Sequence, residues 1–535
     1  MSTKTKREKP PPLFHPYSRR FYFLMLLAIG FCCTTYMRIH LAITMTCMVN
    51  STAIAITEDE IYHPEHSNFT IDVKMDTKKK NATLLDPQCE RQADDGHPIV
   101  VDYGGTLLWS HRTQNIIFSG TFWGALLVIG PSMLIWHRCS SRLILLVAMI
   151  SYVVVTFATP FLAIHFGPIA VFSARVIMGF GEGFVVPSFN ALISNWFPVE
   201  ERSTALAVYT TGNQLAGAIG NPLAAALCAS PFGWPGVFYS IAIFGSLWCV
   251  LWMFTSTDHP RNCKRISQKE YEYLTTNIVH SSNRKSKPSS VPYARMFTSP
   301  PFLAQLLCFY TTNLTMTFYH FYMPSFLKDV LYLGVIANGT FSSLPNVVNL
   351  VCKISWGILM DRLKSKKLIT PTFAVRISQS VASFGSALAF LMVAMFVDCS
   401  TPMLALVLFS FMYGSMGGFS SGFYTSLLSL APRYTSTMSA ISLFIGVLAR
   451  LSIPPLVGFI KTTGTLTEWR ILFCSVAVTN VFAGAVFLLF GSGDVQEWGH
   501  DDVKEKEKPV EKVVLVDEVV LIKSRRTDSI CVEYE

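Results

Sequence analysis

The stretch ARVIMGFGEGFVVPSFNALISNWFPVEERS, residues 174–203, combines a long apolar run with charges that a lipid bilayer would exclude. Arg175 and Glu182 are seven residues apart, so on a helix they project from the same face, two turns from each other. The glycines between and beside them would let a neighbouring helix backbone come close. An ionisable side chain inside a membrane span is energetically costly, and it therefore marks a candidate functional site. The alternative is that Arg175 and Glu182 neutralise each other and only join helices.

The composition indicates an integral membrane protein. Of the 535 residues, 51% are apolar and only 14% are charged, whereas soluble globular proteins carry about 25% charged residues. Apolar runs of about 20 residues recur along the whole chain, and this is the length that a helix needs to cross a bilayer. The formal net charge of +9 is concentrated in the loops between these runs, which is typical of a membrane protein's cytoplasmic side. We therefore expect the lipid bilayer, and not nucleic acid, as a partner.

The apolar runs divide the chain into two halves of six spans, which predicts an all-α membrane protein with 12 transmembrane helices. The predicted organisation is a cytoplasmic segment 1–20, a first half 21–256 with an outer loop 50–112, a cytoplasmic loop 257–300, a second half 301–492 and a cytoplasmic tail 493–535. The spans are expected at about 21–48, 113–136, 143–166, 168–197, 204–229, 235–256, 301–329, 339–361, 370–397, 402–430, 436–461 and 470–491.

Charge and sequence triplets predict the orientation of these spans. Lysine and arginine dominate residues 1–20 and the loop 257–300, and basic loops favour the cytoplasmic side. The loop 50–112 then lies outside. It contains Asn68 and Asn81 in N-x-S/T triplets, which we expect to be glycosylated. Such triplets also occur by chance, but here they agree with the charge rule.

The loops show no pattern that predicts an enzyme. The 13 cysteines have no zinc or haem spacing, and most lie in apolar runs, where cysteine behaves as a small hydrophobic residue. No nucleophile–base arrangement stands out either. We expect neither catalysis nor a resident metal or cofactor.

The tail carries one short pattern of its own. Asp517, Leu521 and Ile522 have the spacing of an acidic dileucine sorting signal, which would bind sorting adaptors. So short a pattern also arises by chance in a solvated, disordered tail.

The division into halves is typical of secondary transporters, whose substrate site lies between the halves near the middle of the membrane. Residues 357–367, GILMDRLKSKK, lie between spans 8 and 9 and resemble the signature loop of the major facilitator superfamily. The matching segment of the first half, GPSMLIWHRCSSR at 130–142, lacks an acidic residue and carries bulky side chains.

Further motifs resemble one family of that superfamily, which includes sialin, the vesicular glutamate transporters and the type I sodium/phosphate cotransporters. The resemblance extends from about Arg20 to Trp498. Because several matches occur in the same order, the resemblance is specific. The motifs are YMRIHLAI (36–43), the stretch 174–203, DHPRNCKRISQKEYEY (258–273), LAPRY (430–434), EWRILF (468–473) and GSGDVQEW (491–498).

The resemblance implies transport of a small organic or inorganic anion, with H+ or Na+ as a co-transported ion. It assigns Arg38 to the substrate's anionic group, Arg175 to a supporting positive charge and Glu182 to proton coupling. A guanidinium stays charged in a buried site and binds carboxylate or phosphate through two parallel hydrogen bonds. Burial and a neighbouring arginine act in opposite directions on the pKa of a buried carboxylate, so such a group can exchange a proton near neutral pH.

Several positions depart from the family pattern. In vesicular glutamate transporters a histidine near the start of span 2 and an arginine in span 7 are tied to substrate or coupling, and Phe118 and Thr312 stand there in this chain. These changes argue against glutamate as the substrate. Arg450 in span 11 stands where the family usually has a small residue, and it either contacts the anion or extends toward the membrane interface. His40, Phe118 and His320 are further candidates for lining the cavity, although a lone histidine in a span more often bonds a backbone carbonyl.

The predicted function is therefore secondary active transport of an organic anion by alternating access, driven by a proton or sodium gradient or by the membrane potential. One alternative is sodium-dependent cotransport of inorganic phosphate. An alternative of another class is a non-transporting receptor or scaffold on the same fold. The expected location is the plasma membrane or a lysosomal or vesicular membrane.

Overall fold

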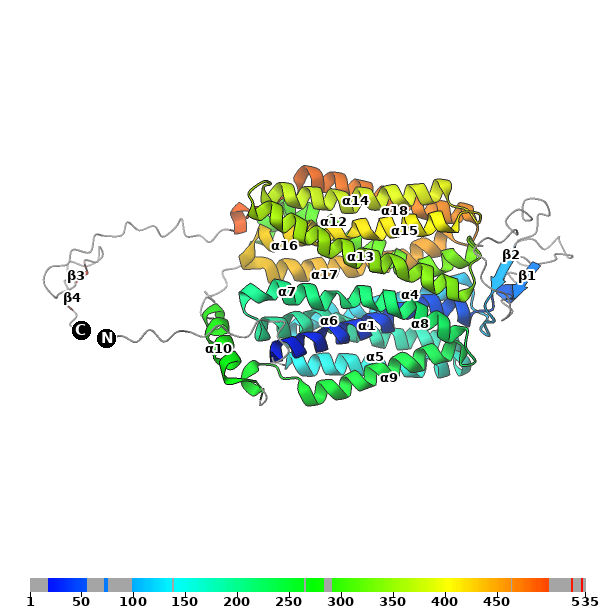
Figure 1. The fold of residues 1–535 in the computed structure, drawn as a ribbon, viewed down its shortest axis with the longest axis horizontal. Helices are drawn as coiled ribbons and strands as arrows, with labels where there is room; N and C mark the ends of the chain where they lie inside the picture. The colour runs from blue at the N-terminus through cyan, green and yellow to red at the C-terminus, as the bar shows by residue number, and fades with distance from the viewer. Residues whose placement is uncertain are drawn as a thin grey trace.

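The computed structural model describes residues 18–54, 72–75, 99–136, 139–263, 266–282, 291–462, 464–499, 521–522 and 531–532. Most of these residues are helical, and the long helices run side by side in one bundle (Figure 1). The helices of the first half form one layer, in blue to green, and those of the second half form the other, in green to orange.

The first half follows the expected spans, with its fifth span broken at Thr211. Its helices are α1 (Arg19–Met48), α4 (His111–Trp136), α5 (Ser141–His165), α6 (Gly167–Trp196), α7 (Val199–Thr210), α8 (Gly212–Cys228) and α9 (Gly233–Thr255). In the loop after α1, strands β1 (Asp72–Met75) and β2 (Ile99–Asp102) pair in parallel, with Asp72 opposite Ile99.

The second half begins after three short elements of the central loop. These are η1 (Pro260–Asn262), α10 (Gln268–Ser282) and α11 (Tyr293–Phe297). The later elements are α12 (Pro300–Asp329), α13 (Val335–Ser365), α14 (Pro371–Phe396), α15 (Pro402–Met416), η2 (Gly417–Ser420), α16 (Phe423–Leu430), η3 (Pro432–Tyr434), α17 (Thr435–Ile460), α18 (Leu466–Phe490), η4 (Glu497–Gly499), β3 (Leu521–Ile522) and β4 (Cys531–Val532). Strands β3 and β4 pair in antiparallel fashion.

Length and apolarity identify nine membrane-crossing segments among the described residues, namely α1, α5, α6, α9, α13, α14, α15–α16, α17 and α18. The other three long segments pack within the same bundle: α4 against α6 and α17, α8 against α1 and α13, and α12 against α17 and α18. Segment α12 is less apolar because it is rich in threonine and tyrosine, which face the interior of the bundle. The protein is thus an all-α membrane protein with 12 spans in two six-helix halves, as the fold prediction stated.

Glycines determine how close α6 lies to α4. A Cβ atom at Gly124 would lie 2.0 Å from the carbonyl oxygen of Val176, and one at Gly179 would lie 2.2 Å from that of Thr121. No side chain fits at such distances, so the crossing of the two helices requires glycine at both positions. Because Gly179 lies one turn before Glu182, this crossing also positions the carboxylate.

At one end of the bundle, α10 is joined to the start of α1. Glu270 is fully buried and accepts hydrogen bonds from the backbone N–H groups of Arg19 and Arg20, at 3.0 and 3.1 Å. The first N–H groups of a helix have no acceptor within the helix, so this carboxylate caps α1 from another element. Arg20 also forms ion pairs with Glu270 at 3.0 Å and with Glu201 of α7 at 2.5 Å. Figure 1 shows α10 beyond this end, opposite β1 and β2.

The end that carries β1 and β2 is the outer end in the predicted orientation. In the same orientation, the loop between α14 and α15 also lies on the outer side. It contains Cys399, which is disulfide-bonded. Disulfides persist outside the reducing cytosol. The disulfide therefore agrees with the orientation inferred from charge.

Contacts between the two halves seal the outer end. Lys328 of α12 donates to the carbonyl oxygen of Thr46 at 2.8 Å and to Ser51 Oγ at 2.6 Å, both in the first half. The Tyr322 hydroxyl donates to Asn115 Oδ1 of α4 at 2.8 Å. At the other end, α7 and α16 pack mainly against helices of their own halves, and Lys353 of α13 donates to the Thr210 hydroxyl of α7 at 3.1 Å. The structure therefore has the two halves closed together on the outer side.

Candidate functional site

A carboxylate on α6 lies between arginines of two other helices. Glu182 Oε1 accepts a hydrogen bond from Arg38 Nη1 of α1 and another, at 2.9 Å, from Arg450 Nη1 of α17. Glu182 Oε2 accepts a hydrogen bond from the hydroxyl of Tyr152 of α5. Helices α1, α5, α6 and α17 therefore meet at one carboxylate, and α17 belongs to the second half.

This cluster is largely withdrawn from solvent. The exposed fraction is 8% for the side chain of Glu182, 18% for that of Arg38 and 17% for that of Arg450. Arg450 is held in place by a hydrogen bond from its Nε to the carbonyl oxygen of Gly446 at 3.3 Å, and its guanidinium lies 5.8 Å from the ring centre of Phe122. With Glu182 ionised, the three side chains carry one net positive charge. A buried positive charge of this kind attracts an anion.

Arg175 does not pair with Glu182. Its side chain is buried, its Nη1 contacts only the sulfur of Met178 at 3.5 Å, and its Nη2 has no hydrogen-bond partner among the described residues. The alternative that Arg175 and Glu182 neutralise each other is therefore wrong for this structure, because two helical turns separate them and the partners of Glu182 come from other helices. A buried guanidinium without an acceptor is costly.

The second half adds a histidine and a tyrosine to the same region. His320 Nε2 of α12 lies 2.9 Å from the hydroxyl of Tyr413 of α15, whose ring stacks on Tyr319 with 4.4 Å between ring centres. Both His320 and Tyr413 lie within electrostatic reach of Arg38. The site thus offers an imidazole and a phenol near the guanidinium of Arg38.

The other residues expected to line the cavity lie elsewhere. His40 is buried in the first half, with Nδ1 2.8 Å from the carbonyl oxygen of Tyr36 and its ring 4.9 Å from that of Phe238. Phe118 packs edge-on against Phe321 of α12, within the outer seal. In this conformation His40 belongs to the core of the first half, and Phe118 belongs to the contacts that seal the outer end.

Three further predictions fall outside the described residues. They concern the glycosylation of Asn68 and Asn81 and the acidic residue of the sorting pattern, Asp517. Leu521 and Ile522 of that pattern form strand β3. Glycosylation and sorting therefore remain predictions.

Sequence reasoning did not single out Tyr152. The residue lies among the apolar side chains of the third span and is fully buried. A buried tyrosine hydroxyl usually finds a hydrogen-bond partner, so a tyrosine in the middle of an apolar span was the signal that could have found it. The identity of its partner, Glu182, follows only from the packing of α5 on α6.

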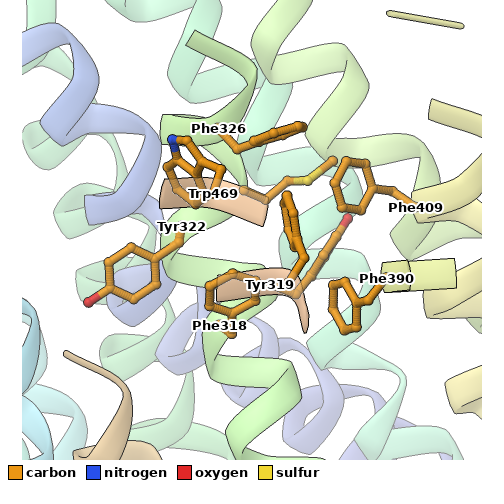
Figure 2. A pocket seen from close by; sticks show the side chains of 9 residues that line it. Phe318, Tyr319, Tyr322, Phe326, Phe390, Phe409 and Trp469 are labelled. Carbon is orange, nitrogen blue, oxygen red and sulfur yellow. The ribbon is translucent and has the colours of Figure 1, made fainter. Parts of the chain in front are cut away.

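Two cavities of the second half lie away from this site. One has a volume of about 10 Å³, roughly one water molecule, and lies in the aromatic core of the second half. Figure 2 shows the rings of Phe318, Phe390 and Phe409 around it, with the hydroxyl of Tyr322 directed away. The other, of about 800 Å³, lies between α13, α14 and α15 of the second half. The arginines described above line neither cavity.

Comparison with known proteins supports the fold and the family. The model of the Major Facilitator Superfamily matches residues 27–454. The uncharacterized transporter slc-17.3 of Caenorhabditis elegans is 48% identical, over 97% of this chain and 99% of the relative. Human sialin is 30% identical over 80% and 86% of the two chains, and a putative inorganic phosphate cotransporter of Drosophila melanogaster is 26% identical over 93% and 89%. The crystal structure of a D-xylose–proton symporter superposes with a TM-score of 0.60 at 13% identity, covering 90% of this chain and 100% of the other.

Proposed function

Because the chain belongs to the Major Facilitator Superfamily, and within it to the family of sialin, the vesicular glutamate transporters and the sodium-dependent phosphate transport proteins, we propose that it carries an organic anion by alternating access. It is a multi-pass membrane transporter and not an enzyme. In this proposal the two halves rock about a central site, which opens to one side of the membrane at a time. The membrane is the plasma membrane or a lysosomal or vesicular membrane.

The arrangement of Glu182 between Arg38 and Arg450 carries this proposal. Two guanidiniums share one carboxylate, so the buried cluster keeps a net positive charge that an anionic substrate can neutralise. The three side chains come from both halves, as a site between rocking halves requires. Arg175, which is buried and forms no ion pair with a carboxylate among the described residues, adds a second positive charge in the first half.

Glu182 also supplies a means of coupling. When a proton binds its carboxylate, the two guanidiniums lose their anionic partner and are able to accept the substrate's anionic group. One proton and one monovalent anion then enter together, and the net charge of the cluster stays the same. An anion driven by the membrane potential alone would instead change the charge of the cluster by one when it binds. A membrane potential of 100 mV supplies about 2.3 kcal/mol for each elementary charge that crosses.

A second candidate function is sodium-dependent cotransport of inorganic phosphate. It is favoured by the likeness to the sodium-dependent phosphate transport protein 3 of Mus musculus and to the putative inorganic phosphate cotransporter of Drosophila melanogaster. A guanidinium binds phosphate as readily as carboxylate, so the cluster fits both anions.

Uptake by the purified full-length protein in proteoliposomes tests the proposal. Radiolabelled gluconate, glutamate and inorganic phosphate are offered while a pH gradient, a sodium gradient and a membrane potential are applied one at a time. We expect uptake of a carboxylate driven by the pH gradient or the potential. Uptake of phosphate alone, and only with sodium, would favour the second candidate. If no anion enters under any gradient, the receptor or scaffold alternative replaces both.

A further inference from the structure

We propose that Arg450 ties the two halves of the transporter together through Glu182, and that during transport it holds the substrate's carboxylate in the place that Glu182 occupies here. The first part concerns the protein's own contacts. The second part rests on the proposed function and names the chemical class of the substrate, a carboxylate.

The position of the ion pair in the chain supports the tie. Among the residues that the structure describes, the 2.9 Å contact between Arg450 and Glu182 is the only ion pair that joins the first half to the second. The other pairs lie within one half or connect the central loop to α1. Both partners are largely buried, with 17% and 8% of their side chains exposed. Water therefore screens this pair less than it screens a surface pair.

The direction of the Arg450 side chain is set by its surroundings. Its Nε donates to the carbonyl oxygen of Gly446 one turn earlier, and its guanidinium faces the ring of Phe122 on α4. Of the two outcomes that the sequence left open for this residue, the structure shows the side chain directed into the bundle and not toward the membrane interface.

The hydrogen bonds of Glu182 describe a site made for one carboxylate. One oxygen accepts from Arg38 and Arg450, and the other accepts from the hydroxyl of Tyr152. A substrate carboxylate has the same two oxygens in the same plane, so it can take the guanidinium bonds that Glu182 makes. Glu182 and the substrate then compete for the same two donors. A substrate that replaces Glu182 also preserves a bridge between the first and the second half.

Hydrogen–deuterium exchange of the purified full-length protein tests the tie without any substrate. Arg450→Gln removes the charge, and we expect faster exchange in peptides that cover the sealed outer ends, residues 43–49 and 320–331, because the outer-closed state loses a bridge between the halves. Arg470→Gln is the matched control, since Arg470 lies on α18 with an exposed side chain, and we expect no change there. Because the tie acts through Glu182, the double variant that combines Arg450→Gln with Glu182→Gln should exchange no faster than Arg450→Gln or Glu182→Gln alone.

Transport kinetics test the place of the substrate. We expect Arg450→Gln to raise the KM for gluconate by about 10-fold or more, because a charge-assisted hydrogen bond is lost. Arg450→Lys keeps the charge without the planar fork, so its KM should lie between those of wild type and Arg450→Gln.

The outcomes separate the two parts. Unchanged exchange in Arg450→Gln overturns the tie. A KM within twofold of wild type overturns the role of Arg450 in binding the carboxylate. If wild type takes up none of the tested anions, the proposed function fails and the carboxylate site fails with it, whereas the exchange result still decides whether the two halves are tied.

Discussion

At the scale of single residues, Arg38 and Arg450 share one acceptor oxygen of Glu182, yet they come from different halves. Removal of either arginine leaves Glu182 paired with the other one. Removal of Glu182 instead leaves both guanidiniums without a carboxylate. The arginines should therefore be replaceable without loss of the fold, while Glu182 controls the charge of the whole cluster.

Arg38→Ala should abolish anion uptake while the protein stays folded and inserted. The guanidinium binds the substrate's anionic group in our proposal, and Arg450 still neutralises Glu182 when Arg38 is absent. Uptake in proteoliposomes measures the first effect, and size-exclusion chromatography with thermal unfolding measures the second. Arg38→Lys should retain part of the uptake. Normal uptake by Arg38→Ala would remove the central assignment.

Glu182→Gln should flatten the pH dependence of uptake. The groups that face Glu182 are Arg38 from α1, Tyr152 from α5 and Arg450 from α17, and arginine and tyrosine ordinarily keep their charge between about pH 5 and 8. Uptake rates from pH 5 to 8 give the profile. His320 is the nearby side chain that can also titrate, so His320→Gln is the control and should keep the wild-type profile. A Glu182→Gln profile like that of wild type would show that the proton is carried elsewhere.

At the scale of elements, Glu270 connects the central loop to the first span. Its carboxylate caps α1 and pairs with Arg20, which also reaches Glu201 of α7. Three elements at the end of the bundle opposite β1 and β2 therefore depend on one buried carboxylate.

Glu270→Gln should destabilise the protein, by about 3 kcal/mol, since removal of one partner leaves a buried charge less well compensated. Thermal unfolding in detergent measures this effect, and the midpoint temperature of Glu270→Gln should lie below that of wild type. Glu272→Gln changes an exposed carboxylate two residues along the same helix and should leave the midpoint nearly unchanged. Equal midpoints for the two variants would contradict the capping role.

At the scale of the whole molecule, the halves meet at the outer end, and the loop after α1 takes part in this seal. Lys328 of the second half bonds to Thr46 and Ser51 and lies 4.6 Å from the ring centre of Tyr103. Asp102 orders the same loop by accepting from the backbone N–H of Thr52 at 3.2 Å and of Gly104 at 2.8 Å.

Asp102→Asn tests the contribution of this loop through pH. Burial raises the pKa of Asp102. Hydrogen bonds from Thr52 and Gly104 and the charge of Lys328 lower it by more than burial raises it, so the pKa lies below its ordinary value. A carboxyl with a lowered pKa stabilises the folded state above its unfolded pKa, and the contribution is lost as the pH falls through the folded pKa. From pH 8 to 5, Asp102→Asn should unfold at a midpoint temperature that lies below that of wild type by a constant difference. This difference corresponds to a loss of about 1 kcal/mol in the free energy of unfolding. The difference should shrink below about pH 4. A difference that disappears already near pH 6 would contradict this account.

The sequence by itself determined the spans, their division into halves, the family and the ionisable residues worth testing. These properties depend on local quantities, such as the length of an apolar run, the charge of the next loop and the order of motifs. The break of the fifth span at Thr211 and the tyrosine partner of Glu182 were not visible in that way.

Only the tertiary structure decided which charges meet. Arg175 and Glu182 share a helix face, and periodicity alone allowed them to neutralise each other. The packed bundle instead brings Arg38 and Arg450 to Glu182 and leaves Arg175 without a carboxylate. The physical reason is that helical periodicity specifies the direction of a side chain from its own axis, whereas its partner depends on which helix packs opposite at that depth. The partners of Glu182 depend on the glycine contacts that hold α6 against α4 and on the packing of α17, from the other half, against α4.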